Sequence, residues 1–454
     1  MAEEDYSGAA PHEPYAVWKY AGYRRFLIGS FVAAFGGQMA AVAVSWQVYR
    51  MTGSATALGL LGLVNVIPLL ALSLPAGMLA DHADRRKVIR ISTAGIAVLS
   101  LALAALSYWQ DEVPRLPWLE AGNRWLAAIA GVFEREVDPA TLNFSHPALP
   151  LLYLILFLMA VLRIGGMSSR AALVPLLVPA KRLSSAVTWN SSAFEIATMA
   201  GPALGGFLIA WMGFPLIYVI NAGCAAALAF LLVGMHYAET PPPPAEPPSL
   251  RGMMAGAGFI WSRKRILAAC TLDLFAVLLG GVTVLLPVYA DRILGVGPVG
   301  LGWLRAAPCA GAFAMAMWMA HRRPFQTPGI ILLWAVAGFG ASILVFGLST
   351  SLWLSLLALF ATGVFDNVSV IVRHSLVQLL TPNHLRGRVV SVNQIFIGSS
   401  NEIGALRAGL MAALLGPVAA VVWGGIGTIL VVLVVFKTVP QLRTTPALDR
   451  LRPE

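Results

Sequence analysis

Hydrophobic residues in this chain fall into long runs, and short polar stretches that carry most of the charges separate these runs. A run of about 20 apolar residues can cross the hydrocarbon core of a bilayer as a helix, which satisfies its own backbone hydrogen bonds. We count about twelve such runs. The pattern therefore predicts an all-α polytopic membrane protein.

Two longer polar segments interrupt the runs, and they divide the chain into parts. The segment PPPPAEPPSL is typical of a stiff, extended linker that cannot pack. We expect an N-terminal six-helix bundle at 1–236 with an external insert at 109–150, a cytoplasmic linker at 237–265, a C-terminal six-helix bundle at 266–438 and a cytoplasmic tail at 439–454.

The insert has apolar residues at helical spacing from Trp118 to Phe133, after Pro117 at a favourable first helical position. This spacing predicts an amphipathic helix. It would lie on the outer membrane surface, the interpretation we favour, or cover the external mouth of the protein.

Composition supports a membrane protein, since 58% of the 454 residues are hydrophobic and only 11% are charged. A soluble domain carries about 25% charged residues. The net charge of +10 comes from bases in short loops, so we interpret it as an orientation signal and not as a nucleic-acid surface. The alternation of basic and nearly base-free loops predicts both termini in the cytoplasm. We expect a multi-pass protein of a bacterial inner membrane, with no cleavable signal peptide.

The charged turn GMLADHADRRKVIR lies between the second and third runs. An anion beside several cations on a tight turn can hold two helices together, so we interpret the turn as a gating loop formed by Gly77, Asp81, Arg85, Arg86 and Lys87. Its pattern resembles the loop signature of the major facilitator superfamily of transporters. Asp84 replaces a glycine of that signature, and His82 replaces a base.

Further stretches carry the same resemblance. Arg163 three residues before Gly166 resembles the fourth-span motif of that superfamily. A fifth-span motif associated with exporters is matched by Gly201, Pro202, Gly205 and Gly206, small residues and a proline that allow close helix packing. The stretches GVFDNVSVIVRHSLVQLLTPNHLRGRV and GSSNEIGALRAGLMAALLG resemble the enterobactin-exporter branch, which includes drug-efflux proteins. The resemblance implies the major facilitator fold and alternating access about a central site.

Export against a gradient needs an energy source, and the chain has no phosphate-binding GxxxxGK[ST] loop. We therefore expect proton antiport. Desolvation favours the protonated form of a carboxylate, so an intramembrane acid can carry the proton. The candidates are Asp273, Glu195, Glu402 and Asp366. Asp273 is the first choice because its run contains no base, whereas Asp366 could pair with Arg373 and Glu402 with Arg407. Each acid is equally compatible with a structural ion pair.

Polar residues within the runs are the candidates for the substrate cavity. Arg163 and Arg373 would attract an anionic ligand, and neutral hydrogen bonds could come from Gln38, Asn367, Asn393, Gln394 and Asn401. His374 is a further polar residue inside a run, which we interpret as a pocket residue and not as a metal ligand.

Our leading functional hypothesis is a proton-coupled exporter of a siderophore or a similar amphiphilic small molecule. The alternatives are a broad drug-efflux pump, a lysolipid translocator of the same fold and a non-transporting membrane scaffold. We expect no enzyme, because HExxH and GxSxG are absent from the sequence. We also expect no cofactor or metal, and partners limited to a small molecule, protons and the bilayer, with a monomeric chain.

Overall fold

The computed structural model describes residues 15–134, 143–179, 182–235, 250–321 and 325–447. Helices make up the regular structure of these ranges, and no strand occurs in them. The helices are α1 (Ala21–Thr52), α2 (Ala55–His82), α3 (Arg85–Tyr108), α4 (Pro117–Phe133), α5 (Ala148–Leu177), α6 (Leu183–Leu231), α7 (Leu250–Ser262), α8 (Lys264–Gly280), α9 (Leu286–Val288), α10 (Gly297–Ala320), α11 (Pro328–Leu348), α12 (Leu352–Leu380), α13 (Asn383–Leu415), α14 (Pro417–Thr438) and α15 (Pro440–Arg443).

The described residues contain 10 helical segments that are long and apolar enough to cross a membrane. One of them, in α6, has 47 residues and would be roughly 70 Å long if it were straight. It is kinked at Gly213, where φ is 77°, so it accounts for two crossings. The polar α13, with 33 residues, is also long enough to cross. Together these segments confirm the expected all-helical architecture of about twelve spans.

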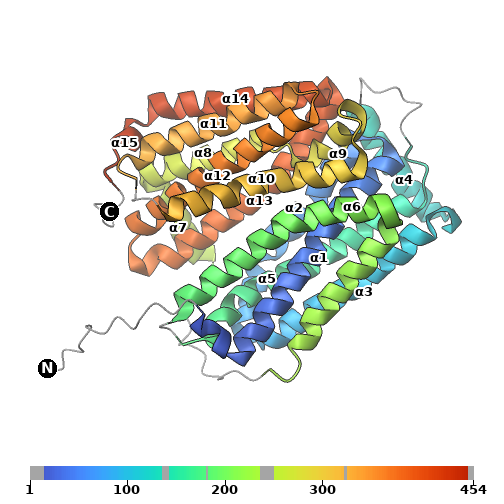
Figure 1. Cartoon of the computed structure of the whole chain (residues 1–454), viewed down its shortest axis with the longest axis horizontal. Coiled ribbons are helices and arrows are strands. Elements are labelled where there is room, and N and C mark those ends of the chain that lie inside the picture. Colours follow the sequence, from blue (N-terminus) through green and yellow to red (C-terminus); the bar gives the residue numbers. More distant parts are fainter. Residues whose placement is uncertain (1–14, 135–142, 180–181, 236–249, 322–324, 448–454) are drawn as a thin grey trace.

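The long helices form two groups that lie side by side (Figure 1). In the N-terminal group, α6 packs on α1 and α3, and α5 packs on α2 and α3. In the C-terminal group, α12 packs on α10 and α11, and α8 packs on α13 and α14. The groups meet along two helix pairs, α2 with α13 and α6 with α10.

Both pairs cross at glycines near one end of the molecule, which we call the Gly53 end because α1 turns into α2 there. A methyl group added at Gly409 of α13 would collide with the backbone of Gly59 in α2, and one added at Gly206 of α6 would collide with the backbone of Gly302 in α10. Gly59 and Gly302 lie in the first two turns of their helices. The groups are therefore held together backbone to backbone at the Gly53 end.

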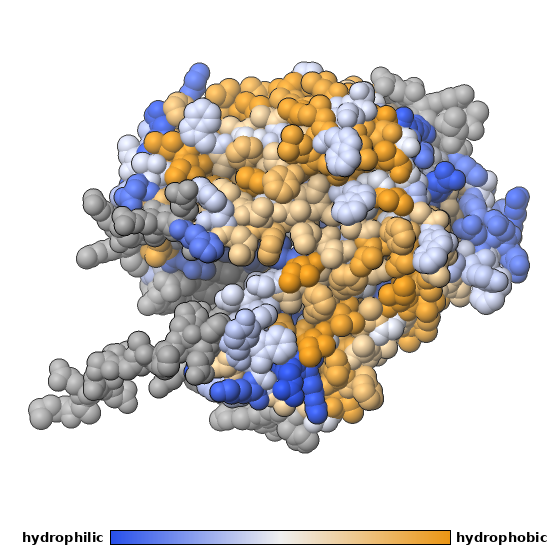
Figure 2. All heavy atoms as spheres, in the orientation of Figure 1, coloured by the Kyte–Doolittle hydropathy of each residue, from blue (hydrophilic) through white to orange (hydrophobic). Residues whose placement is uncertain are grey.

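Polar contacts join the groups at the same end. Arg292, which follows α9, donates a hydrogen bond to the carbonyl oxygen of Gly53 at 3.1 Å. Arg50 lies 4.0 Å from Asp291 in an exposed ion pair. Toward the opposite end, where α1 begins, Figure 2 shows the surfaces of the two groups separating around a hollow. Hydrophobic residues cover the sides of the helices in this view, and hydrophilic ones gather at their ends.

The seventh span differs from the continuous helix expected at 266–290. The helix α8 ends at Gly280, and the chain continues through short helical turns to Ile293. A methyl group at Gly280 would strike Ile343 and Phe339 of α11, so a larger residue would not fit there. Because α8 ends at Gly280, its last carbonyl groups have no hydrogen-bond partner within the helix.

The insert helix α4 contacts α2 and α5 of the N-terminal group and α13 of the C-terminal group. Its buried face carries Leu119, Leu126 and Ala130, while Trp118 and Trp125 are exposed. Beyond its end, the Glu134 carboxylate accepts hydrogen bonds from the Ser54 hydroxyl and, at 3.1 Å, from the backbone N–H of Thr56. These contacts with both groups favour a helix that covers the Gly53 end over one that rests only on the membrane.

Candidate transport site

A buried ion pair joins α8 and α12 inside the C-terminal group. The Arg373 guanidinium contacts the Asp273 carboxylate, and the two residues are only 2% and 6% exposed. The sequence-based pairing of Arg373 with Asp366 is wrong. Seven residues of one helix separate those two by about 10 Å, whereas Asp273 faces Arg373 from the neighbouring helix. Asp273 is thus not the unneutralised acid that its own span suggested.

Three other polar residues surround this pair. The Cys270 thiol donates a weak hydrogen bond to the Asn393 side-chain oxygen, with 3.5 Å between sulfur and oxygen. His374 is partly buried and interacts electrostatically with Arg373. Of the predicted cavity residues, the structure therefore gathers Arg373, His374 and Asn393 around Asp273.

A second polar cluster crosses the interface between the groups. Arg163 of α5 donates a hydrogen bond to the side-chain oxygen of Asn65 in α2 at 2.9 Å. Glu402 of α13 interacts with both of these residues. An acid of the C-terminal group thus meets a base and an amide of the N-terminal group.

Arg407 has a different role from the pairing with Glu402 that we considered. Its Nε donates to the carbonyl oxygen of Leu278 at 2.8 Å, and its terminal nitrogen donates to that of Leu279. A separation of five residues turns two side chains about 140° apart around a helix, so Glu402 and Arg407 face different neighbours. Arg407 caps the C-terminal end of the interrupted helix α8.

A third cluster contains the other two predicted proton carriers. Glu195 of α6 and Asp366 of α12 interact electrostatically across the two groups. Cys309 of α10 interacts with Glu195 and is hydrogen-bonded with Thr198. Among the described residues, no ion pair neutralises either carboxylate.

The small residues of the fifth-span motif lie where α6 meets its neighbours. A methyl group at Gly201 would strike Gln38, and one at Gly205 would strike the backbone of Met39, both in α1. Pro202 is buried, and its carbonyl oxygen would lie 2.8 Å from a methyl group on Gly302. Gly206 faces α10, as described above.

The remaining predicted cavity residues lie outside these three polar clusters. Gln38 is partly buried beside Gly201, and Gln394 is exposed. Asn401 is exposed and donates to the Ile397 carbonyl of its own helix at 2.8 Å. Asn367 has a buried side-chain oxygen for which the described residues supply no hydrogen bond.

The charged turn begins α3, and part of it is described. The Asp84 carboxylate accepts hydrogen bonds from the backbone N–H groups of Arg86 and Lys87, so the residue that departs from the family signature is the N-cap of α3. Arg86 also donates to the carbonyl oxygen of Met235, beyond the end of α6. Arg85 and Lys87 are in the first turn of α3. The surroundings of Gly77 and the side chain of Asp81 lie outside what the structure describes, so the predicted lock stays a prediction.

Sequence reasoning missed one interior base, Arg305 of α10. Its terminal nitrogen donates to the Ser45 hydroxyl of α1 at 3.1 Å, which again links the two groups. Its Nε is buried, and the described residues offer it no hydrogen-bond partner. The signal was visible as a lone arginine within an apolar run, a placement that usually marks function.

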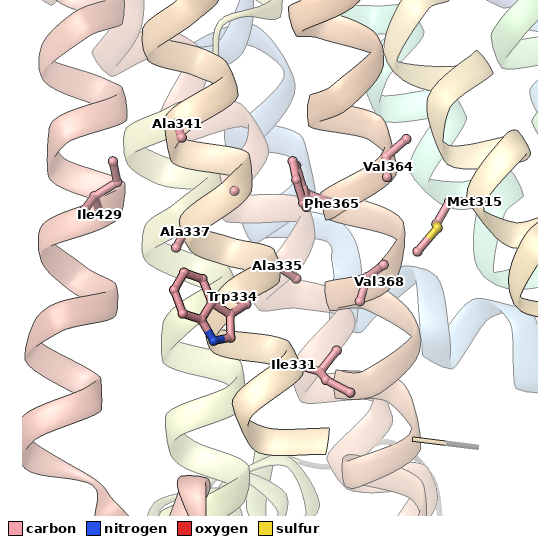
Figure 3. A pocket seen from close by; sticks show the side chains of 11 residues that line it. Met315, Ile331, Trp334, Ala335, Ala337, Ala341, Val364, Phe365, Val368 and Ile429 are labelled. Carbon is pink, nitrogen blue, oxygen red and sulfur yellow. The ribbon is translucent and has the colours of Figure 1, made fainter. Parts of the chain in front are cut away.

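The described residues also form two apolar cavities on the sides of the helices. The first, of about 540 Å³, belongs to the C-terminal group alone and is lined by α10, α11, α12 and α14, with Trp334, Phe365 and Met315 around it (Figure 3). The second, of about 650 Å³, lies between the groups. It is lined by α6, α10 and α12, including Met199, Ala307 and Trp353.

Comparison with known proteins places this architecture in a class. Residues 26–327 match the profile of the Major Facilitator Superfamily. The chain belongs to this superfamily, whose members are transporters and not enzymes. It is therefore a multi-pass membrane transport protein, as its apolar runs and its family resemblance together predicted.

The chain is similar to curated enterobactin exporters named EntS. Those of Escherichia coli O1:K1 / APEC and Shigella boydii serotype 18 are each 25% identical over 433 residues, which cover 93% of this chain and 94% of theirs. Among solved structures, an inward-facing bacterial homologue of the human lysosomal transporter Spinster has a TM-score of 0.66 at 14% identity, over 95% of this chain and 99% of that one. A bacterial homologue of the iron transporter ferroportin has a TM-score of 0.60 at 15% identity, over 90% and 98%.

Proposed function

We propose that this protein is a secondary active exporter that couples the inward movement of protons to the export of an amphiphilic small molecule, with siderophores as the first substrate class. The observation that carries the coupling is the electrostatic interaction of Glu195 with Asp366 across the two groups. We further propose that it works as a monomer in a bacterial inner membrane.

The proposed orientation follows the distribution of bases. Arg85, Arg86 and Lys87 lie at the end of the molecule where α1 begins, and Lys264 and Lys437 start and end helices there. Bases favour the cytoplasmic side of a membrane. Both termini and the linker at 237–265 would then be cytoplasmic, and the Gly53 end would face outward. With this end closed, the conformation is inward-facing.

The acid pair fits a proton site because of its charge. Two carboxylates that interact electrostatically resist ionising together, because each negative charge raises the cost of the other. One shared proton removes that cost. Asp273 is a weaker choice than its sequence suggested, because Arg373 already balances its charge.

The same pair supplies a link between protons and alternating access. Glu195 belongs to the N-terminal group and Asp366 to the C-terminal group. Repulsion between two ionised carboxylates favours separation of α6 from α12, and protonation favours their approach. The proton state of this pair would therefore bias the balance between inward- and outward-facing conformations.

The substrate class rests on the relatives. Proteins similar over 93% of this chain are enterobactin exporters, and enterobactin is a siderophore. The export of an iron chelator is tested by untargeted mass spectrometry of the spent medium of iron-starved cells with and without the gene. A chelator found outside only when the gene is intact, and retained inside when it is lost, supports the proposal. An unchanged medium contradicts the substrate class.

Proton coupling is tested in proteoliposomes with an imposed pH gradient. We expect Glu195→Gln and Asp366→Asn to abolish gradient-driven transport while exchange of substrate for substrate continues. Glu120→Gln, at an exposed position of α4, is the control and should transport normally. Gradient-driven transport by both site variants would contradict the proposed coupling.

One observation favours a second candidate, a translocator of lysolipids or other membrane-dissolved amphiphiles. The cavity of about 650 Å³ between α6, α10 and α12 offers an apolar surface at the interface of the two groups. Met199, which lines it, is one helical turn from Glu195. A molecule entering from the bilayer along this cavity would reach the acid pair.

A further inference from the structure

The interior arginines of this protein differ in what balances them. Arg373 is paired with Asp273, and Arg407 donates to two backbone carbonyl groups. Arg163 contacts Asn65 and interacts with Glu402. Arg305 has no carboxylate partner among the described residues, and it donates a hydrogen bond to the neutral hydroxyl of Ser45.

The local geometry leaves Arg305 with unused donors. A guanidinium has five N–H groups, and its Nε here is buried without a partner. The Ser45 hydroxyl donates its own hydrogen to the carbonyl oxygen of Val42 at 3.0 Å, so only its oxygen lone pairs face Arg305. A desolvated cation with free donors is costly inside a membrane protein unless an anion or water reaches it.

The position of Arg305 is suited to a substrate. It lies on α10, where this helix meets the N-terminal group, and its contact with Ser45 crosses the interface. Cys309, one turn further along α10, interacts with both Arg305 and Glu195. A negative group held by Arg305 would therefore lie close to the acid pair proposed to carry the proton.

We propose that Arg305, positioned by its hydrogen bond to Ser45, forms a binding subsite for an oxyanion of the exported molecule, such as a carboxylate or an ionised catechol. This inference rests on the proposed export function and adds the charge of the group that is recognised. The planar fork of arginine donors matches two oxygens of such an anion. Because the two residues come from different groups, the anion would be bound where the groups move against each other.

The test measures binding to the purified full-length protein in nanodiscs of phosphatidylcholine. Isothermal titration uses two probes, a catechol amide of serine with a free carboxylate and the matching carboxamide, which has no charge on that group. Lysophosphatidic acid is a third probe, for an anion of lipid origin. We expect the unmodified protein to prefer the carboxylate over the carboxamide.

Arg305→Gln should weaken carboxylate binding by about tenfold or more, with less than about a twofold effect on the carboxamide. Arg305→Lys should keep part of the preference, because the charge remains and the fork is lost. Ser45→Ala removes only the hydrogen bond between Arg305 and Ser45, so this variant should retain most of the preference for the carboxylate. Arg25→Gln, at an exposed arginine of α1, is the matched control and should bind both probes normally.

Several results would overturn this inference. Equal weakening of both probes by Arg305→Gln and Ser45→Ala would mean that the contact only holds the groups together. An unchanged carboxylate preference in Arg305→Gln, or binding of lysophosphatidic acid alone, would also contradict it. The proposed proton coupling is tested separately, in the transport assay. If the coupling is wrong, transport will not respond to the pH gradient, while the binding preference at Arg305 can persist.

Discussion

Arg373 of α12 and Asp273 of α8 form an ion pair that is almost completely buried. Such a pair offers little net stability compared with apolar residues, but the loss of one partner leaves a buried charge that nothing balances. The pair therefore connects the two helices in a manner that is sensitive to single substitutions.

We expect Arg373→Met to lower the free energy of unfolding by about 3–5 kcal/mol, and Asp273→Asn to lower it similarly. The double variant should lose less than the sum, because neither charge remains. Thermal unfolding in detergent measures all three. If Asp273→Asn abolishes gradient-driven transport at unchanged stability, Asp273 carries the proton and the structural role is wrong.

The fold was predictable because the bilayer leaves so few choices. Long apolar runs must be helices, and their number and the polar linker follow directly from the sequence. The break after Gly280 was not predicted, and the close packing of this glycine against Phe339 and Ile343 of another helix is not visible in the sequence.

The polar clusters were harder to predict, for a physical reason. The sequence singled out four intramembrane acids, but the partners considered for Asp366 and Glu402 were residues of their own helices. Arg373 is bound by a residue 100 positions earlier, and Arg163 is linked to Asn65, 98 positions earlier. A single sequence does not say which helices are neighbours, so the partners become visible only in three dimensions.

The capping role of Arg407 gives a prediction about additivity. Arg407→Met should lower stability by about 1–3 kcal/mol, because the ends of α8 lose charge-assisted hydrogen bonds. Combined with Glu402→Gln, the effects should add to within about 0.5 kcal/mol, as for residues that share no contact. A double-mutant cycle by thermal unfolding measures this. A larger coupling energy would instead support a direct interaction between Glu402 and Arg407.

The glycine crossing of α2 and α13 predicts a conformational effect. Gly409→Leu should keep the groups apart at the Gly53 end, because its side chain would collide with the backbone of Gly59. Spin labels at positions 50 and 291, which lie on opposite groups, report the separation. We expect the measured distance to increase. Gly37→Leu is the control, since nothing lies within 4 Å of an added methyl group there. An unchanged distance in Gly409→Leu would mean that the crossing does not control closure.

The contact of the insert with α2 predicts a local loss of stability. Glu134→Ala removes the acceptor for the Ser54 hydroxyl and the Thr56 N–H, so the first turn of α2 should lose about 1–2 kcal/mol, as when a helix cap is removed. Hydrogen exchange of the amides in that turn measures the loss. The exposed Glu120→Ala serves for comparison and should leave these amides protected. Equal exchange in both variants would show that the insert does not hold this end.

The cavity between the groups predicts a dependence on how the transported molecule arrives. Ala307→Trp should fill this cavity and reduce transport of a fluorescent lysophosphatidylcholine several-fold, while a water-soluble catechol is transported normally. Ala337→Trp fills the comparable cavity within the C-terminal group and is the matched control, because that cavity does not touch α6 (Figure 3). Size-exclusion chromatography establishes that both variants fold, and transport in proteoliposomes is compared for the two compounds. Equal transport of the lysolipid by both variants would contradict the lateral route. Equal losses for both compounds in Ala307→Trp would mean that the cavity wall controls the movement of the groups and not the entry of lipid.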